Sequence, residues 1–124
     1  LPDMAEGGVI INMSSIAGLG ANEMMGSAYT ASKHGIIGMT KTAAREYAAV
    51  GIRINAICPG VIDTDIAERS FMSDERIARK VLKMHPLGRL GRVEEVADAV
   101  AWMASGQSSF MTGHALILDG GASC

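Results

Sequence analysis

The sequence has little cysteine, few aromatic side chains and no excess of charge of one sign. Its two cysteines, Cys58 and Cys124, are too few for a disulfide framework, and neither belongs to a CxxC pair. The 11 Lys and Arg residues nearly balance 13 Asp and Glu residues, so nothing favours nucleic acid or an anionic membrane as a partner. No apolar run approaches the roughly 20 residues that cross a bilayer. These absences predict a cytoplasmic globular protein without nucleic-acid or membrane partners.

The chain alternates short apolar runs with longer segments of helical periodicity. Three apolar runs are predicted strands covered on both faces, as in a parallel sheet, at 8–14, 52–58 and 114–118. Helices are predicted from about 27 to 50, from about 73 to 84, and from 93 to 104. An order of strand, helix, strand, helices and strand is typical of a doubly wound α/β fold.

The first predicted helix has one face on which small and apolar residues recur at helical spacing. These residues are Ala28, Ala31, Ser32, Gly35, Ile36, Met39, Ala43 and Tyr47. We expect this face to pack closely and Gly51 to end the helix. The first predicted strand begins almost at residue 1, so one of its edges has no predicted neighbour. Three parallel strands with such an edge look like half of a domain.

Polar residues follow the first two predicted strands, at 12–15 and 59–64, and ligands of open α/β sheets bind beyond the carboxyl ends of strands. The helix between them opens with Tyr29 and Lys33, which lie four residues apart on one face. A phenol is ordinarily too weak an acid for proton exchange at neutral pH, but a nearby ammonium stabilises the phenolate. The pair therefore suits a general acid or base, with a serine hydroxyl beside it to hold a carbonyl oxygen. The spacing alone more often marks an ordinary solvated pair.

Four ordered segments resemble the second half of the short-chain dehydrogenase/reductase family. They are INMSSIAG at 11–18, YTASK at 29–33, RINAICPG at 53–60 and LDGG at 118–121. The resemblance covers nearly the whole chain and implies a Rossmann-type doubly wound parallel sheet, of which this chain supplies three strands with flanking helices. It also implies an oxidoreductase that uses NAD or NADP to interconvert an alcohol and a ketone or aldehyde by hydride transfer.

The resemblance implies a role for each site residue. Ser15 would bind the oxygen of a small-molecule alcohol or carbonyl substrate. Tyr29 would be the general acid or base, in contact with substrate and cofactor, and Lys33 would bind the nicotinamide ribose and favour the ionised tyrosine. The nicotinamide carboxamide would be received by the backbone of Pro59, Gly60 and Ile62 and by the hydroxyl of Thr64. Family members pair through the long helix and the late helix, so a homodimer or homotetramer is expected of the complete protein.

Two departures from the family pattern affect these expectations. The interval from Ser15 to Tyr29 is one residue longer than the commonest family spacing, which leaves open whether Ser14 or Ser15 is the working serine. We favour Ser15 because it directly precedes the Ile-Ala-Gly stretch. No glycine-rich phosphate loop follows a strand, and no ribose selector is present, so the choice between NAD and NADP stays open. We therefore expect residues 1–124 to be the C-terminal catalytic part of one dinucleotide-binding domain, without its N-terminal nucleotide-binding half and inactive alone.

Other functions and sites have less support. A hydrolase is disfavoured because no GxSxG elbow occurs. A non-catalytic binding or structural subunit of the same fold is the alternative, although such proteins usually lose the tyrosine, lysine or serine. The three histidines have no ligand-like spacing, so no metal site is predicted. Cys58 is expected to be a small buried residue, whereas Met24 and Met25 are expected either to line an apolar substrate pocket or to fill gaps. The resemblance implies that Phe71 and Met72 lie in a segment that covers the substrate, with a surface or interface role as the alternative.

Overall fold

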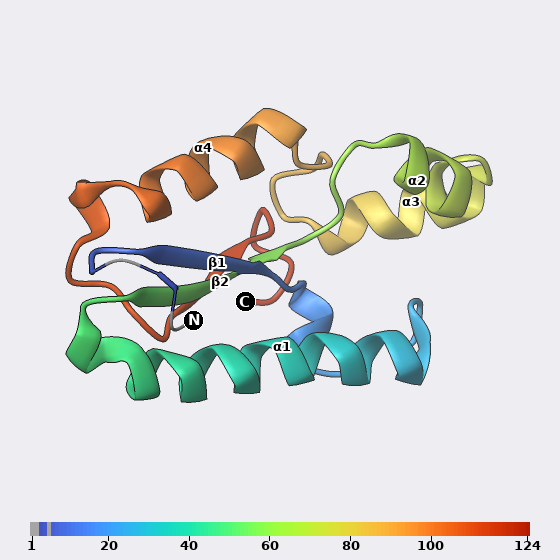
Figure 1. The fold of residues 1–124 in the computed structure, drawn as a ribbon. Coiled ribbons are helices and arrows are strands. Elements are labelled where there is room, and N and C mark those ends of the chain that lie inside the picture. The colour runs from blue at the N-terminus through green and yellow to red at the C-terminus, as the bar shows by residue number, and fades with distance from the viewer. Residues whose placement is uncertain (1–2, 5) are drawn as a thin grey trace.

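Three parallel strands lie between two layers of helix in a computed structural model that describes residues 3–4 and 6–124 (Figure 1). The strands are β1 (Val9–Met13), β2 (Arg53–Pro59) and β3 (Ala115–Leu118). They lie in the order β1-β2-β3, with Ile11 opposite Asn55 and Ile57 opposite Leu116. The predicted Rossmann-type α/β architecture, three parallel strands with flanking helices, is confirmed.

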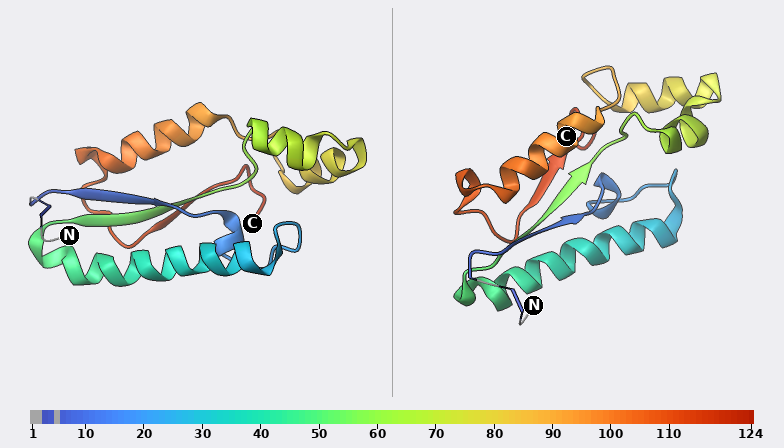
Figure 2. Two further views of the ribbon diagram at one scale, coloured as in Figure 1. Left: turned by 45° about the vertical axis from the view of Figure 1, so that its right-hand side comes forward. Right: turned by 45° about the horizontal axis from the view of Figure 1, so that its top comes forward.

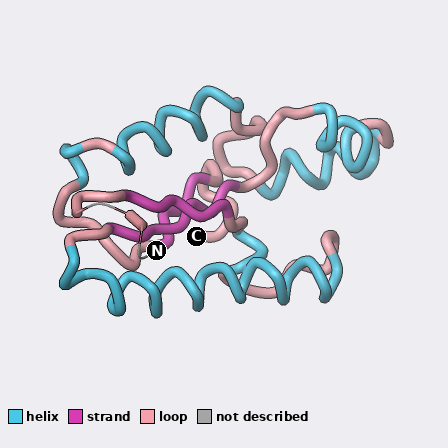
Figure 3. Tube along the Cα trace, viewed as in Figure 1, coloured by secondary structure: helices cyan, strands magenta, loops and turns pink. Residues whose placement is uncertain are grey.

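Helices cover both faces of the sheet. The long helix α1 (Gly26–Tyr47) runs along one face, and α4 (Val93–Ala104) runs along the other (Figure 1). A short helix α2 (Asp65–Ala67), a π-helical turn (Glu68–Met72) and α3 (Glu75–Met84) lie beyond the carboxyl ends of the strands, away from the sheet (Figure 2). The rest of the described chain is loop or short 3-10 turn (Figure 3). No helix in the described part of the chain is long and apolar enough to span a membrane.

The central strand β2 forms the most deeply buried part of the chain. Ile54, Ala56 and Ile57 are at most 1% exposed, which is why this run is almost continuously apolar. Asn55 is buried among them, but its amide donates to one backbone carbonyl and accepts from one backbone N–H in the segment before β3. Because both groups of the amide are paired, the polar side chain fixes that segment without the cost of an unsatisfied buried group.

The predicted packing face of α1 is only partly buried within the described residues. The buried residues of this helix are Ile37, Thr40 and Ala44, and Thr40 Oγ1 accepts a hydrogen bond of 2.9 Å from Asn12 Nδ2 in β1. Of the predicted face, Ile36, Ala43 and Tyr47 are partly buried, whereas Ala28, Ala31, Ser32, Gly35 and Met39 are exposed. A polar bond to β1 and apolar packing on β2 set the rotation of the helix, so its stripe of small residues faces outward.

The predicted helix ends agree closely with the structure. Gly51 has φ of 75°, a left-handed conformation that favours glycine, and it follows the 3-10 turn that extends α1. Asp74 caps α3 by accepting hydrogen bonds from the backbone N–H groups of Arg76 and Ile77. The sequence did not predict α2 and the π-helical turn, because the eight residues there carry no sustained periodicity.

Candidate active site

A cavity of about 220 Å³ opens beyond the carboxyl ends of β1 and β2. Five of the predicted site residues line it together: Ser15, Tyr29, Gly60, Ile62 and Thr64. The other two, Lys33 and Pro59, do not line it. Lys33 lies one turn beyond Tyr29 on α1, and Pro59 is the buried last residue of β2. The five come from three separate segments, the turn after β1, the helix α1 and the loop after β2, and converge on one small volume.

Ser14 and Ser15 have different surroundings. Ser14 is buried and donates a hydrogen bond of 2.9 Å to the backbone carbonyl of Lys33. Ser15 Oγ accepts from the N–H of Ala17 at 3.1 Å and caps a 3-10 turn. Its own O–H hydrogen has no acceptor among the described residues and can donate into the cavity. Gly18 allows this turn to lie against α1, since a Cβ there would be 2.6 Å from the Lys33 carbonyl oxygen. The structure therefore favours Ser15 over Ser14 as the serine that faces a ligand.

Lys33 links the end of β1 to the ring of Tyr29. Its Nζ donates to the backbone carbonyl of Met13 at 3.1 Å and lies 5.4 Å from the centre of the Tyr29 ring. An ammonium carries three N–H donors, so two remain for a ligand. This hydrogen bond holds the ammonium group near the ring of Tyr29.

The loop after β2 presents unpaired polar groups toward the cavity. Two backbone hydrogen bonds join the residues on either side of Ile62 to Gly91 and fix the loop. Within residues 3–4 and 6–124, the N–H and C=O of Ile62 itself have no hydrogen-bond partner. Thr64 Oγ1 accepts from the N–H of Ala67 at 3.2 Å as the cap of α2, so its hydrogen is also free. The loop thus offers both a donor and an acceptor to a ligand.

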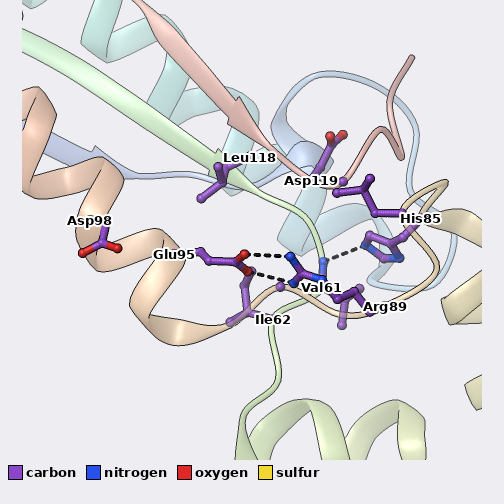
Figure 4. Close-up of a pocket in the computed structure, with 11 residues that line it drawn as sticks. Val61, Ile62, His85, Arg89, Glu95, Asp98, Leu118 and Asp119 are labelled. Carbon is purple, nitrogen blue, oxygen red and sulfur yellow. Dashed lines mark hydrogen bonds and ion pairs between the residues drawn. The ribbon is translucent and has the colours of Figure 1, made fainter.

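His85 supports this loop, although its position in the sequence suggested no role beyond that of a possible metal ligand. The imidazole is 2% exposed, its Nε2 accepts from the N–H of Val61 at 3.2 Å, and its Nδ1 donates to the carbonyl of Val81 at 2.8 Å (Figure 4). Gly60 lies so close that a Cβ would be 2.9 Å from Nε2. The last turn of α3 is thus joined to the loop at 59–64 through one side chain. No spacing signal in the sequence reports such a contact.

A second cavity, of about 300 Å³, lies on the α4 side of the same loop and contains a strong ion pair (Figure 4). The guanidinium of Arg89 donates two hydrogen bonds to the Glu95 carboxylate, at 2.8 and 2.9 Å. Glu95 also accepts from the backbone N–H of Arg92 and so caps α4. The bonds from Arg89 and then from the Arg92 backbone lower the pKa of Glu95 from 4.5 to about 2.

The remaining wall of the first cavity is apolar. Its apolar side chains include Ile16, Met24, Met25, Phe71 and Met84, and none of the described residues that line it is charged. Met24, Met25 and Phe71 therefore lie where the pocket interpretation expected them. Cys58 is fully buried in β2, and burial raises the pKa of its thiol, as expected of a packing residue. No group of three metal-ligating side chains occurs within the described residues.

Comparison with known proteins identifies the family. A family model described as enoyl-(acyl carrier protein) reductase matches residues 1–123. The chain belongs to the short-chain dehydrogenase/reductase family. Among its relatives of this family, the cyclohexanol dehydrogenase of Acinetobacter sp. (strain SE19) is 47% identical over 117 residues, which cover 94% of the chain and 43% of that protein. The 3-oxoacyl-(acyl-carrier-protein) reductase of Thermotoga maritima is 44% identical over 114 residues, 92% of the chain and 45% of that protein.

Solved structures of family members share the fold. A 4-hydroxyisoleucine dehydrogenase in complex with NADH superposes with a TM-score of 0.89 at 34% identity, and ElxO with NADP bound superposes with a TM-score of 0.81 at 38% identity. The alignments cover 94% and 93% of the chain, but 47% and 46% of those proteins. The chain thus spans less than half the length of the relatives that it matches.

Proposed function

We propose that the complete protein containing these residues is an NAD- or NADP-dependent oxidoreductase that interconverts an alcohol and a ketone or aldehyde. The observation that carries this proposal is the single cavity in which Ser15, Tyr29, Ile62 and Thr64 meet. Relatives with 47% and 44% identity are named as a dehydrogenase and a reductase, and solved relatives hold NADH or NADP, which supports the same reaction class.

Three side chains would bind the substrate oxygen and transfer its proton. The free O–H of Ser15 donates to the substrate oxygen and fixes it beside the phenol. Tyr29 gives its proton to that oxygen in the reductive direction and removes it in the oxidative direction. Lys33, tethered to Met13, stabilises the phenolate that remains after the proton has left.

The described residues also fit a nicotinamide cofactor, which would supply or accept the hydride when bound. The free N–H and C=O of Ile62 and the free hydroxyl of Thr64 would bind its carboxamide, with Pro59 and Gly60 shaping the loop. The two remaining N–H groups of Lys33 would bind its ribose hydroxyls, beside Tyr29. These contacts orient the ring toward the cavity and do not distinguish NAD from NADP.

We further propose that the chain is the C-terminal catalytic part of one dinucleotide-binding domain. β1 pairs with β2 on one side, and within the described residues no strand pairs with its other edge. An apolar strand with an open edge needs a neighbour. A preceding nucleotide-binding half would supply that neighbour together with the phosphate loop that this sequence lacks.

Substitution of Tyr29 tests the proposed reaction. In the complete protein, Tyr29→Phe is expected to lower kcat by about 10²–10⁴-fold, because it removes the proton donor, and to leave cofactor affinity nearly unchanged. Turnover of a ketone panel with NADH and NADPH, with cofactor Kd in parallel, provides the measurement. Tyr47→Phe is the matched control, since Tyr47 lies on the same helix but packs against the core.

Two results would contradict the proposal. Near-normal turnover by Tyr29→Phe would remove the proton-transfer role from this residue. Cofactor binding by the complete protein without turnover of any alcohol or carbonyl compound would favour the alternative, a non-catalytic binding or structural subunit of the family.

A further inference from the structure

The apolar cavity beside Ser15 and Tyr29 restricts what can enter it. Its walls beyond the polar residues include Ile16, Phe71 and three methionines, and none of the described lining residues is charged. A charged group in such a cavity would lose its hydration without gaining a counter-charge. The volume of about 220 Å³ is small, and the nicotinamide carboxamide proposed to bind at Ile62 and Thr64 would occupy part of it. The cavity therefore suits a compact, uncharged group.

A larger cavity of about 620 Å³ adjoins the first one. The two share four lining residues, Ile16, Asn22, Met24 and Met84, so these side chains form the wall between them. Asn22 is held in place because its Oδ1 accepts a hydrogen bond of 3.2 Å from the N–H of Met25. Met24 and Met84 are unbranched and have several rotatable bonds, so they are the adaptable part of the wall.

The two methionines come from different segments. Met24 belongs to the loop before α1, and Met84 is the last residue of α3. An exposed ion pair joins the same two segments, with Lys80 Nζ 3.8 Å from Glu23 Oε1. Lys80 and Glu23 line the larger cavity and do not line the smaller one. The boundary between an uncharged compartment and a charged one thus coincides with the methionine wall.

We propose that the substrate is a compact, uncharged, apolar ketone or secondary alcohol, and that Met24 and Met84 set the upper limit on the length of its apolar group. This proposal rests on the function proposed above. Each methylene that fits the first cavity strengthens transition-state binding through burial, and the first methylene that reaches the methionine wall stops this gain.

The test uses the complete protein and a series of linear methyl ketones from 2-butanone to 2-decanone. We expect kcat/KM to rise by about threefold to fourfold per methylene, the equivalent of one buried methylene, and then to fall at a sharp length limit. Met84→Ala and Met24→Ala are each expected to move this limit to longer ketones, because the larger cavity becomes accessible. Met84→Phe is expected to move it to shorter ones.

Controls separate the wall from general effects of substitution. Met84→Leu keeps the volume of the wall nearly constant, so it should not move the limit. 7-Oxooctanoate has the chain length of 2-octanone but ends in a carboxylate. We expect its kcat/KM to be lower than that of 2-octanone by at least about 10²-fold.

The outcomes are distinguishable. An unchanged length limit in both alanine variants, or equal turnover of 7-oxooctanoate and 2-octanone, would overturn this proposal while leaving the oxidoreductase function intact. Failure of the unsubstituted protein to reduce any ketone with either cofactor would overturn both proposals.

Discussion

At the scale of single residues, the two adjacent serines differ in what their hydroxyl groups contact. Ser14 donates to the Lys33 carbonyl within the protein, whereas the hydrogen of Ser15 is free to donate into the cavity. In the complete protein, Ser15→Ala is therefore expected to lower kcat by about 10²-fold, as for loss of one donor to a reacting oxygen, and it also removes the cap of the 3-10 turn. Ser14→Ala is expected to lower the free energy of unfolding by about 1 kcal/mol with a smaller effect on kcat.

Steady-state kinetics and thermal denaturation of the two variants, measured side by side, check this prediction. Each serine serves as the control for the other, because the substitutions remove the same atom from adjacent positions. A larger loss of turnover in Ser14→Ala would transfer the role of substrate-oxygen donor to Ser14.

His85 does not line the cavity beside Ser15 and Tyr29, so we expect it to affect ligand binding through the loop that it contacts. Because Val61 lies between Gly60 and Ile62, loss of its hydrogen bond to His85 would disturb the groups proposed to hold the carboxamide. His85→Leu is expected to raise the Kd for the cofactor by about tenfold, the equivalent of one buried hydrogen bond. His85→Gln keeps an acceptor and is expected to recover part of the affinity.

Fluorescence titration with NADH and NADPH measures the cofactor Kd of both His85 variants. His114→Leu is the control, since His114 is an exposed histidine that lines none of the cavities described above. Unchanged cofactor affinity in His85→Leu would show that the loop keeps its conformation without the imidazole.

At the scale of elements, α4 begins with a charged cap whose contribution depends on pH. The pKa of Glu95 is depressed to about 2, so the carboxylate stabilises the folded state above its unfolded pKa near 4.5 and loses this effect as pH falls through 2. Glu95→Gln is therefore expected to lower Tm at pH 7 by a few degrees. The difference from the unsubstituted protein should shrink steadily as the pH falls from about 4.5 toward 2.

Thermal melts between pH 2 and 7 check the cap, with Glu94→Gln as the matched control. Glu94 is in the same first turn of α4, but no hydrogen bond or ion pair of its side chain occurs within the described residues. An equal loss of Tm in both variants would assign the effect to the helix dipole rather than to the bonds from Arg89 and Arg92.

Elements were predictable where local chemistry decides them. The bounds of α4, the Asp74 cap of α3 and the Gly51 end of the long helix follow from residues adjacent in sequence. The rotation of α1 was not predictable, because it depends on Asn12 of another element reaching Thr40. For the same reason the sequence suggested the tyrosine, lysine and serine of the candidate site but not His85, whose partners come from two segments.

At the scale of the whole molecule, two surfaces of the chain lack partners within the described residues. One is the outer stripe of α1, where Ala28, Ala31, Gly35 and Met39 are exposed. Small residues on one stripe allow another helix to approach closely, which supports the proposal that the complete protein forms a homodimer or homotetramer through this helix. The other surface is the free edge of β1.

The free edge of β1 leads to a prediction for the isolated polypeptide of residues 1–124. An unpaired apolar strand offers backbone donors and acceptors to other chains. In addition, α1 packs on a sheet of three strands and buries less of its surface than it would on a wider sheet. We expect the isolated polypeptide to aggregate or unfold and to show no saturable binding of NAD(H) or NADP(H), since no phosphate loop is present.

Light scattering after size-exclusion chromatography, followed by calorimetric titration with each cofactor, measures both properties. The complete protein is the control and should be monodisperse and bind one cofactor per chain. Stoichiometric cofactor binding by a monomeric 124-residue polypeptide would contradict the proposal that the nucleotide-binding half lies outside these residues.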